Sequence, residues 1–258
     1  MGISEEKYAE LQKKLQSVEQ EFNDFVYTIS HDLKAPLRAI SALTDWLASD
    51  YADKFDNDGK EQLNLLTSRV KRMQSLMDGV LQYSRIGRVT EQPVPIDLNK
   101  LLPQIIDALA APPNIHITVE NQLPVITSEP TRIQQVFANL IGNAVRFMNK
   151  SEGVVKVACE EKDGFWEFSV SDNGPGIEQQ HFERIFKIFQ TLQAKDQLET
   201  TGMGLTIAKK IVTLYGGKIW LNSKIGEGST FFFTLPKSSS DEQLLASAGA
   251  AENKTTGR

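Results

Sequence analysis

The first residues whose types suit chemistry are a neighbouring imidazole and carboxylate, His31 and Asp32, just before Pro36 in a segment with a helical pattern. A neutral imidazole is a competent nucleophile near pH 7, and a carboxylate that accepts from one ring nitrogen fixes its tautomer. Adjacent helical residues point about 100° apart, so their contact is not guaranteed. The pair is therefore either an activated nucleophile or an inert exposed histidine.

Two glycine-rich segments form a second candidate site. Asp172-Asn-Gly-Pro-Gly-Ile177 follows a predicted strand, and Thr200-Thr-Gly-Met-Gly-Leu205 opens a predicted helix. Glycines let the backbone approach an anion closely, and a helix N-terminus favours phosphate. Neither segment has the Gly-Lys-Ser/Thr of a P-loop or the dinucleotide fingerprint. They indicate either a phosphate-binding surface or ordinary turns.

A third candidate lies on one face of a predicted helix, where Asn139, Asn143 and Arg146 are spaced by four and three. Two amides and a cation on one face suit a hydrated Mg²⁺ and a polyphosphate. The alternative is a solvated polar face. Apolar residues such as Val136 and Leu140 weaken that alternative, because they indicate that the same helix is mostly buried.

The element that must position His31 has a coiled-coil pattern. In residues 5–30 the apolar positions alternate by four and three, at Leu11, Leu15, Val18, Phe22, Phe25 and Ile29. After a turn at 56–59 a second run alternates in the same way, at Leu63, Leu66, Val70, Met73, Met77, Val80 and Ser84. The pattern predicts an αα-hairpin with His31 off the seam and a kink at Pro36.

One such hairpin has a narrow seam that it cannot bury alone. Two hairpins would form a four-helix bundle, so the sequence predicts a homodimer. The alternative is a monomeric hairpin packed on the other domain.

A second domain follows residues 88–97, which contain two prolines and are predicted to be a linker. Beyond them helices and strands mix, which predicts an α+β sandwich with helices on one face. The predicted helices are 98–110, 130–148 and 203–215, and the predicted strands are 115–119, 125–126, 154–158, 165–170, 218–222 and 230–235. The polar tail from Lys237 is predicted to be disordered.

The composition argues against several classes of protein. The net charge of -5 gives no support to binding nucleic acid or an anionic membrane. The single cysteine, Cys159, leaves no intramolecular disulfide to form and fits a reducing compartment. No apolar run approaches the roughly 18 residues that span a bilayer. The expectation is a cytoplasmic protein without a membrane segment.

Together these motifs resemble the sequence boxes of sensor histidine kinases. Ser30-His-Asp-Leu-Lys-Ala-Pro36 is similar to their phosphoacceptor box, and Asn139-Leu-Ile-Gly-Asn143-Ala-Val-Arg-Phe147 to their asparagine box. The remaining glycine and phenylalanine boxes resemble Asp172–Gly176, Phe182/Phe186/Phe189 and Gly202–Gly204. The five boxes stand in the family's order between about residue 10 and residue 236. Around His31 the sequence resembles the phytochrome-like branch.

The resemblance implies a multi-domain protein: an all-α dimeric four-helix bundle followed by an α+β sandwich ATP-binding domain of the type shared with Hsp90, MutL and gyrase. It implies ATP and Mg²⁺ as cofactors and a response-regulator receiver as partner. The implied segments are a coiled-coil signalling helix (1–22), a dimerisation and phosphotransfer domain (23–89), an ATP-binding domain (90–236) and a tail (237–258).

The resemblance also implies roles for the bundle residues and for the asparagine box. His31 accepts the γ-phosphoryl group, and Asp32 orients the imidazole and takes its proton. Asn143 ligates Mg²⁺, with Asn139 nearby. Arg146 meets phosphate oxygens, and Phe147 packs at the nucleotide.

At the adenine end, Asp172 accepts from the amino group, and Thr230 lies where the family often has a hydroxyl. The residues implied to line the nucleotide and its lid are Gly174, Gly176, Ile177, Thr201, Gly202, Met203, Gly204 and Leu205.

Two positions depart from the family pattern. Ala35 stands where kinases that also dephosphorylate their partner carry Thr or Asn, so weak or absent phosphatase activity is expected. Thr200 replaces the first glycine of the last glycine box. The competing readings are an ATPase of the Hsp90/MutL type and a nucleotide-binding dimeric scaffold without kinase activity.

Overall fold

The computed structural model describes residues 5–88, 91–192 and 200–237, without some of the side chains that precede residue 24. The chain divides into two compact units, one built on Met1–Arg88 and the other on Val89–Leu192 with Gly202–Arg258. Most of the predicted polar tail lies outside the described residues.

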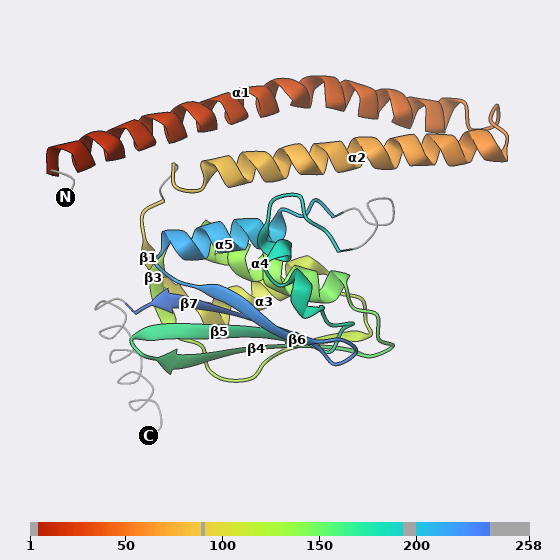
Figure 1. Ribbon diagram of the computed structural model, residues 1–258. Coiled ribbons are helices and arrows are strands. Elements are labelled where there is room, and N and C mark those ends of the chain that lie inside the picture. Colours follow the sequence, from red (N-terminus) through yellow and green to blue (C-terminus); the bar gives the residue numbers. More distant parts are fainter. Residues whose placement is uncertain (1–4, 89–90, 193–199, 238–258) are drawn as a thin grey trace, which may run out of the picture. The chain divides into compact units, whose positions relative to one another are not determined.

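The first unit is a helical hairpin. Helix α1 (Glu5–Asp50) runs without a break through Pro36 and is gently bowed, and α2 (Asn57–Arg85) packs along it (Figure 1). The carboxylate of Asp56 caps α2 by accepting from the Gly59 backbone N–H at 2.8 Å. The predicted αα-hairpin is therefore confirmed.

The coiled-coil seam of α1 stays exposed within the single chain. Phe22 and Phe25 are 65% and 62% exposed, and the same spacing continues through other exposed apolar side chains at Ile29, Ile40, Leu43 and Leu47. Among the α1 side chains that the structure describes, the buried ones are instead Ser30, Leu37 and Thr44, spaced by seven residues. A different stripe of α1 is thus buried, and the apolar seam is left available.

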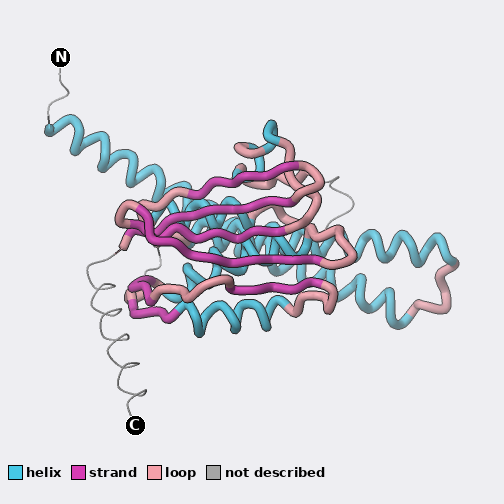
Figure 2. The backbone as a smooth tube through the Cα atoms, turned by 90° about the horizontal axis from the view of Figure 1, so that it is seen from below, coloured by secondary structure: helices cyan, strands magenta, loops and turns pink. Residues whose placement is uncertain are grey.

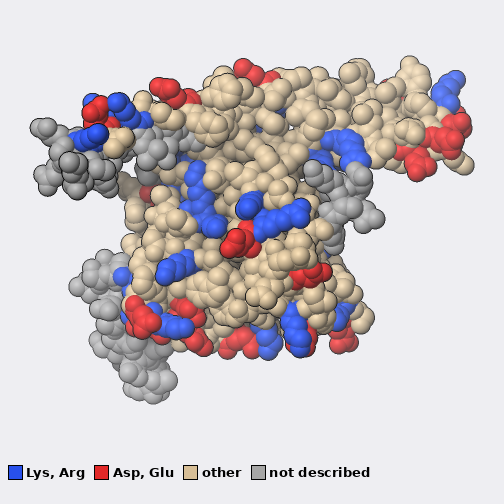
Figure 3. All heavy atoms as spheres, viewed as in Figure 1, with Lys and Arg blue, Asp and Glu red and all other residues tan. Residues whose placement is uncertain are grey.

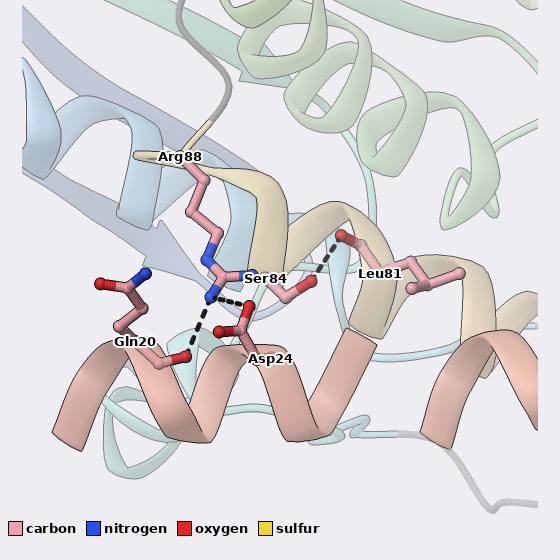
Figure 4. Close-up of polar contacts among 5 residues, drawn as sticks. All are labelled: Gln20, Asp24, Leu81, Ser84 and Arg88. Atoms are coloured by element: carbon pink, nitrogen blue, oxygen red, sulfur yellow. Dashed lines mark hydrogen bonds and ion pairs between the residues drawn. The ribbon is translucent and has the colours of Figure 1, made fainter. Parts of the chain in front are cut away.

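The end of α2 is fastened to α1 two turns before His31 (Figure 4). The guanidinium of Arg88 donates to the Gln20 carbonyl at 3.0 Å and to Asp24 Oδ1 at 2.8 Å. One turn earlier in α2, the Ser84 hydroxyl bonds the Leu81 carbonyl at 3.0 Å. These contacts hold the last turn of the hairpin next to the segment that carries His31.

The second unit contains a five-stranded sheet with the order β2-β4-β5-β7-β6. Strand β2 pairs in parallel with β4, and the other neighbours are antiparallel. The strands are β2 (Ile115–Val119), β4 (Gly153–Lys162), β5 (Phe165–Asp172), β6 (Ile219–Lys224) and β7 (Gly228–Pro236).

A separate ribbon corrects the linker prediction. Part of the predicted linker forms strand β1 (Val94–Asp97), which pairs antiparallel with β3 (Val125–Ser128). Pro95 cannot donate to a ladder, and proline in a sheet is confined to edge strands. The strand is tolerated because both members of a two-stranded ribbon are edges.

Three helices cover one face of the five-stranded sheet: α3 (Leu98–Leu109), α4 (Pro130–Arg146) and α5 (Gly204–Leu214). Figure 2 shows the sheet from its other side, with the strands in front of the helices. Two short 3-10 helices, Gln179–His181 and Arg184–Phe186, precede α5. The predicted sandwich with helices on one face is therefore confirmed.

The core of this unit is an aromatic cluster. Phe137 of α4 meets Phe168 of β5 and Phe233 of β7 edge to face, with ring centroids 5.5 Å and 5.3 Å apart. Phe168 and Phe233 stack at 4.9 Å, and all three side chains are fully buried. Such pairs are favourable geometries for aromatic rings. The cluster fixes which face of α4 is turned towards the sheet.

A buried ion pair joins the start of α4 to the end of α5. Arg132 Nη1 lies 2.6 Å from Glu129 Oε2, and the two side chains are only 9% and 5% exposed. The Tyr215 hydroxyl also donates to Glu129. The backbone N–H of Glu91 completes the set by donating to Glu129 at 2.7 Å. Partners for the buried carboxylate keep its desolvation from destabilising the helix pair.

Acidic and basic side chains are interspersed on the second unit in the face seen in Figure 3, whereas the middle of α1 shows few charges there. Among the described helices, none combines the length and the apolar character needed to cross a membrane.

Candidate phosphoacceptor and nucleotide site

His31 is an exposed side chain with a carboxylate beside it. The side chain of His31 is 72% exposed and that of Asp32 is 73% exposed. His31 Nδ1 lies 3.2 Å from Asp32 Oδ1. The adjacent side chains therefore do meet, which the sequence alone left open. An ionised carboxylate only accepts, so this contact places the imidazole proton on Nδ1. In the neutral imidazole with this tautomer, Nε2 carries the lone pair.

Neighbouring side chains and backbone set the surroundings of His31. Tyr27, one turn earlier, lies face to face with the imidazole at a centroid distance of 6.4 Å. The guanidinium of Arg85 lies 5.8 Å from the Tyr27 ring centroid. Pro36 has no N–H to donate to the Asp32 carbonyl, so the helical ladder is interrupted next to His31.

Helix α4 presents its polar residues opposite the aromatic core. Asn139 and Asn143 are half-buried and one turn apart, Arg146 is exposed, and Phe147 caps the helix C-terminus. A Cβ built on Gly204 would lie 2.8 Å from Asn139 Oδ1, so the start of α5 packs directly on this side chain. Helix α4 thus brings the asparagine segment to the second glycine segment.

The other end of α4 adjoins the first glycine segment. A Cβ built on Gly174 would lie 2.7 Å from Asp172 Oδ1 and 3.9 Å from the Phe147 carbonyl oxygen. The Gly174 backbone N–H donates to Asp172 Oδ1 at 2.8 Å. A side chain at Gly174 would therefore have to displace this carboxylate.

Asp172 lies in a largely desolvated place. Burial raises the pKa of its carboxyl above the ordinary value of 3.8, and the backbone N–H groups of Gly174 and Ser229 offset only part of that rise. The carboxylate is nevertheless positioned as an acceptor at the end of β5. Such a group suits a ligand that presents an N–H donor.

The loop after Asp172 is pinned to the β6–β7 hairpin. Gly176 has φ +74, and a Cβ there would lie 2.1 Å from the Lys224 carbonyl oxygen. The next residue, Ile177, donates its backbone N–H to Ser223 Oγ at 2.7 Å. This part of the site is therefore a fixed wall rather than a loose turn.

The second glycine segment is held against the phenylalanine segment. Gly202 has φ +66, and a Cβ there would lie 2.6 Å from the Gln190 carbonyl oxygen. The Thr206 hydroxyl in the first turn of α5 donates to the Phe186 carbonyl at 3.1 Å. Met203 is buried, whereas Thr201 and Leu205 are half-buried. Most of the polar stretch before this segment, 193–199, lies outside the described residues.

Thr230 does not lie on the same face of the sheet as the Asp172 side chain. It pairs in register with Ser171 and donates to the Ser171 hydroxyl at 3.0 Å, on the sheet face opposite the Asp172 side chain. The hydroxyl beside Asp172 belongs to Ser229, its partner in the β5–β7 register. The sequence reading missed Ser229 and Ser223. Burial alternates along β7, with Phe231, Phe233 and Leu235 buried, and this places Ser229 on the inner face; the residue types of the strand carry no such alternation.

The donor set fits magnesium held with a polyphosphate. Among the described residues, no group of three His, Cys, Asp or Glu side chains is arranged to hold a metal ion. Mg²⁺ is commonly held by one or two protein oxygens together with phosphate oxygens and water. The amide oxygens of Asn143 and Asn139 are the groups on α4 that suit this role.

Replacing the half-buried carboxylate with an amide, Asp172→Asn, is expected to weaken ADP and ATP binding by about ten- to a hundredfold, because a charged hydrogen-bond acceptor becomes a neutral one. Titration calorimetry measures this loss. Asp163→Asn, in the exposed β4–β5 turn, is the matched control. Wild-type affinity in Asp172→Asn would contradict the assignment.

The same variant tests the raised pKa of Asp172. A carboxyl that binds its proton more tightly in the folded state stabilises the fold below its unfolded pKa, and this contribution is lost as pH rises through the folded pKa. Asp172→Asn is therefore expected to flatten the decline of stability above pH 3.8 and to be at least as stable as wild type at neutral pH. Denaturant unfolding at several pH values measures the effect, and a variant less stable at neutral pH would contradict it.

Comparison with protein families gives two matches in consecutive parts of the chain. Residues 23–88 match the His Kinase A (phospho-acceptor) domain. Residues 128–239 match the histidine kinase-, DNA gyrase B-, and HSP90-like ATPase family. Together the two segments cover more than half of the chain.

Similar curated proteins include cyanobacterial phytochromes. The chain is 40% identical over 235 residues to cyanobacterial phytochrome B of Nostoc sp., covering 89% of this chain and 31% of that protein. It is 35% identical over 239 residues to the phytochrome-like protein Cph1 of Synechocystis sp., covering 90% and 31%. The chain therefore spans about a third of the length of these relatives.

Among solved structures, full-length ShkA in complex with AMPPNP matches with a TM-score of 0.63 and 27% identity, covering 83% of this chain and 46% of that chain. The histidine kinase AdeS of Acinetobacter baumannii shares the fold, with a TM-score of 0.55 and 19% identity, over 81% of this chain and 98% of that chain.

Three findings agree: His31 is exposed on a helical hairpin, Asn139 and Asn143 of α4 lie next to the glycine segments, and two family models match the chain. The chain belongs to the histidine kinases and carries the catalytic core of a sensor kinase, a phosphoacceptor domain followed by an ATPase domain of the gyrase B and HSP90 type.

Proposed function

We propose that this chain transfers the γ-phosphoryl group of ATP to His31 and then to an aspartate of a response-regulator receiver. The observation that carries the proposal is the 3.2 Å contact between His31 Nδ1 and Asp32, which leaves Nε2 free on an exposed side chain. An exposed nucleophile can reach a nucleotide first and a receiver afterwards. The AMPPNP complex of ShkA supports nucleotide binding by this type of core.

The transfer needs a nucleophile, a leaving group and a place for one proton. The Nε2 lone pair forms the N–P bond while the bond from the γ-phosphorus to the bridging oxygen breaks, and that electron pair leaves on ADP. The phosphorylated imidazole is then a cation. It becomes neutral when its Nδ1 proton passes to Asp32, which already contacts that nitrogen. In the second step the receiver carboxylate takes the phosphoryl group, ring Nε2 regains its lone pair, and Nδ1 takes its proton back from Asp32.

In this proposal the second unit supplies position and charge neutralisation. Asn143, with Asn139 nearby, would hold Mg²⁺, which neutralises phosphate charge when bound. Arg146 at the end of α4 is exposed and can meet phosphate oxygens. The glycines at 174, 176, 202 and 204 lie where a side chain would strike neighbouring atoms, so the backbone approaches closely.

Labelled ATP separates the kinase from its two competitors. With Mg²⁺ and γ-labelled ATP, the wild-type chain is expected to gain acid-labile label that His31→Gln loses entirely, because glutamine has no nucleophilic nitrogen. His116→Gln, at an exposed position of β2, is the matched control and is expected to keep the label. Phosphate release without label would identify an ATPase, and neither signal would identify a scaffold.

We propose further that two chains pair through the α1 seam. The support is the row of exposed apolar side chains from Phe22 to Leu47, which α2 of the same chain leaves uncovered. Two such faces would bury each other in a four-helix bundle. This arrangement accounts for large apolar side chains that an isolated hairpin would leave in water.

Light scattering is expected to give twice the chain mass of 28.8 kDa, and Phe25→Glu is expected to shift the protein to a single chain by burying a charge in the seam. Leu214→Glu, at another exposed apolar side chain, is the control. A monomeric wild type at micromolar concentration would overturn the proposal.

Ala35 bears on whether the helical bundle can also dephosphorylate its partner. It lies one turn after His31 on the same side of α1 and is exposed. A methyl group cannot orient a water for attack on a phosphorylated receiver, so partner dephosphorylation by this route is expected to be weak or absent.

Ala35→Thr is expected to raise receiver dephosphorylation by about tenfold or more, since a hydroxyl then positions the water. Loss of label from a phosphorylated receiver, incubated with the kinase and ADP, measures the rate. Ala39→Thr, a further turn along the helix, is the control. Robust dephosphorylation by the wild-type bundle would show that Ala35 does not limit it.

A further inference from the structure

Tyr27 and His31 lie one turn apart on the same side of α1. Side chains in a helix point back towards its N-terminus, so the imidazole of His31 leans over the turn that carries Tyr27. The two rings are nearly parallel, with an interplanar angle of 23° and centroids 6.4 Å apart. That separation lies within the range of favourable aromatic pairs. The Tyr27 ring therefore flanks the imidazole on its N-terminal side.

Two contacts together restrict the imidazole of His31, which is otherwise surrounded by water. Asp32 Oδ1 lies at its edge, 3.2 Å from Nδ1. The Asp32 side chain is itself 73% exposed, so this bond alone leaves both side chains able to turn together. Tyr27 adds a flat surface beside the ring plane. A planar ring held at one edge and along one face keeps one orientation, and with it the direction in which Nε2 points.

Tyr27 is in turn held from α2. The guanidinium carbon of Arg85, the last residue of α2, lies 5.8 Å from the Tyr27 ring centroid, within the range of a cation–π contact. Arg88 bonds Asp24 at 2.8 Å and keeps this end of α2 on α1 (Figure 4). Tyr27 is 41% exposed, so no surrounding core fixes its ring. The end of α2 thus acts on His31 through Tyr27.

We propose that Tyr27 is a positioning residue for phosphoryl transfer: its ring, held by Arg85, orients the His31 imidazole so that Nε2 is aligned with the incoming γ-phosphorus. The inference rests on the proposed transfer from ATP to His31. In-line displacement needs the attacking lone pair directed at phosphorus. A nucleophile that loses its orientation therefore reacts more slowly with a bound donor, although its own chemistry is unchanged.

Matched variants separate the ring from the helix that carries it. Tyr27→Leu removes the ring, and because leucine is the better helix former, α1 is not weakened by the change. Tyr27→Phe keeps the ring and is the conservative variant. Tyr51→Leu makes the same change at another exposed tyrosine of the hairpin and is the control. Arg85→Gln removes the cation, with Lys71→Gln at an exposed position of α2 as its control.

The first measurement is the rate of labelling of the whole chain against the concentration of γ-labelled ATP with Mg²⁺. Tyr27→Leu is expected to lower kcat about tenfold and to leave KM for ATP unchanged, because only the alignment of the nucleophile is lost. Tyr27→Phe is expected to restore kcat, and Tyr51→Leu and Lys71→Gln to keep it. Arg85→Gln is expected to lower kcat in the wild-type background and not in Tyr27→Leu, since both act through one ring.

The second measurement uses phosphoramidate, whose N–P bond breaks to release ammonia as the bond from phosphorus to Nε2 forms. This small donor diffuses to an exposed imidazole from any direction, so its reaction does not need a fixed ring. Tyr27→Leu is expected to take the phosphoryl group from phosphoramidate at the wild-type rate, measured by mass spectrometry. An equal loss of rate with phosphoramidate and with ATP would show that Tyr27 affects reactivity and not orientation, and would overturn the proposal.

An unchanged kcat in folded Tyr27→Leu would also overturn the proposal, and so would an equal fall in Tyr51→Leu. If Tyr27→Leu does not fold, Arg85→Gln decides, because it changes only an exposed side chain at the end of α2. A wild-type kcat in Arg85→Gln would then overturn the proposal. A wild-type chain that is phosphorylated by phosphoramidate but takes no label from ATP would instead contradict the proposed kinase activity itself, which keeps the two failures distinguishable.

Discussion

The packing of Phe137 against Phe168 and Phe233 is the interaction on which the nucleotide site depends. It fixes the rotation of α4, because the three rings are fully buried and meet edge to face or stacked. A helix rotated by one residue would turn its polar face by about 100°. With the aromatic face fixed, Asn139 and Asn143 are left on the side that meets the start of α5. Core and site are thus two faces of one helix.

Close approaches between the backbone and neighbouring atoms also fix the rest of the site. Gly174, Gly176 and Gly204 each lie where a Cβ would come within 3 Å of a neighbouring oxygen. Larger residues would push apart Asp172, the β6–β7 hairpin and Asn139. The hydroxyl of Ser223 then adds directional bonds to the same wall. The hairpin unit differs, because His31 is exposed, as the proposed transfer to it from a nucleotide and from it to a receiver requires.

Much of the fold could be predicted from the sequence, because its signals are local. Heptad spacing predicted the hairpin, and apolar alternation predicted most strands of the sheet. The ribbon strand β1 was missed because two prolines in 88–97 indicate a linker, and only its pairing with β3 shows that an edge strand tolerates them. The predicted seam of α1 stays exposed within the single chain, and the sequence could not show that α1 buries a different stripe, with Ser30, Leu37 and Thr44.

The sequence by itself determined which residue types were available: an imidazole beside a carboxylate, an asparagine face and glycines at fixed spacing. Tertiary structure decided which of them meet. The run Phe231-Phe232-Phe233 has no alternation of polarity, so the sequence alone did not reveal whether Ser229 or Thr230 faces the core. Pairing with β5 settles it, because a shift of one residue exchanges the two faces of a strand. Ser229 therefore lies beside Asp172, and Thr230 lies on the other face.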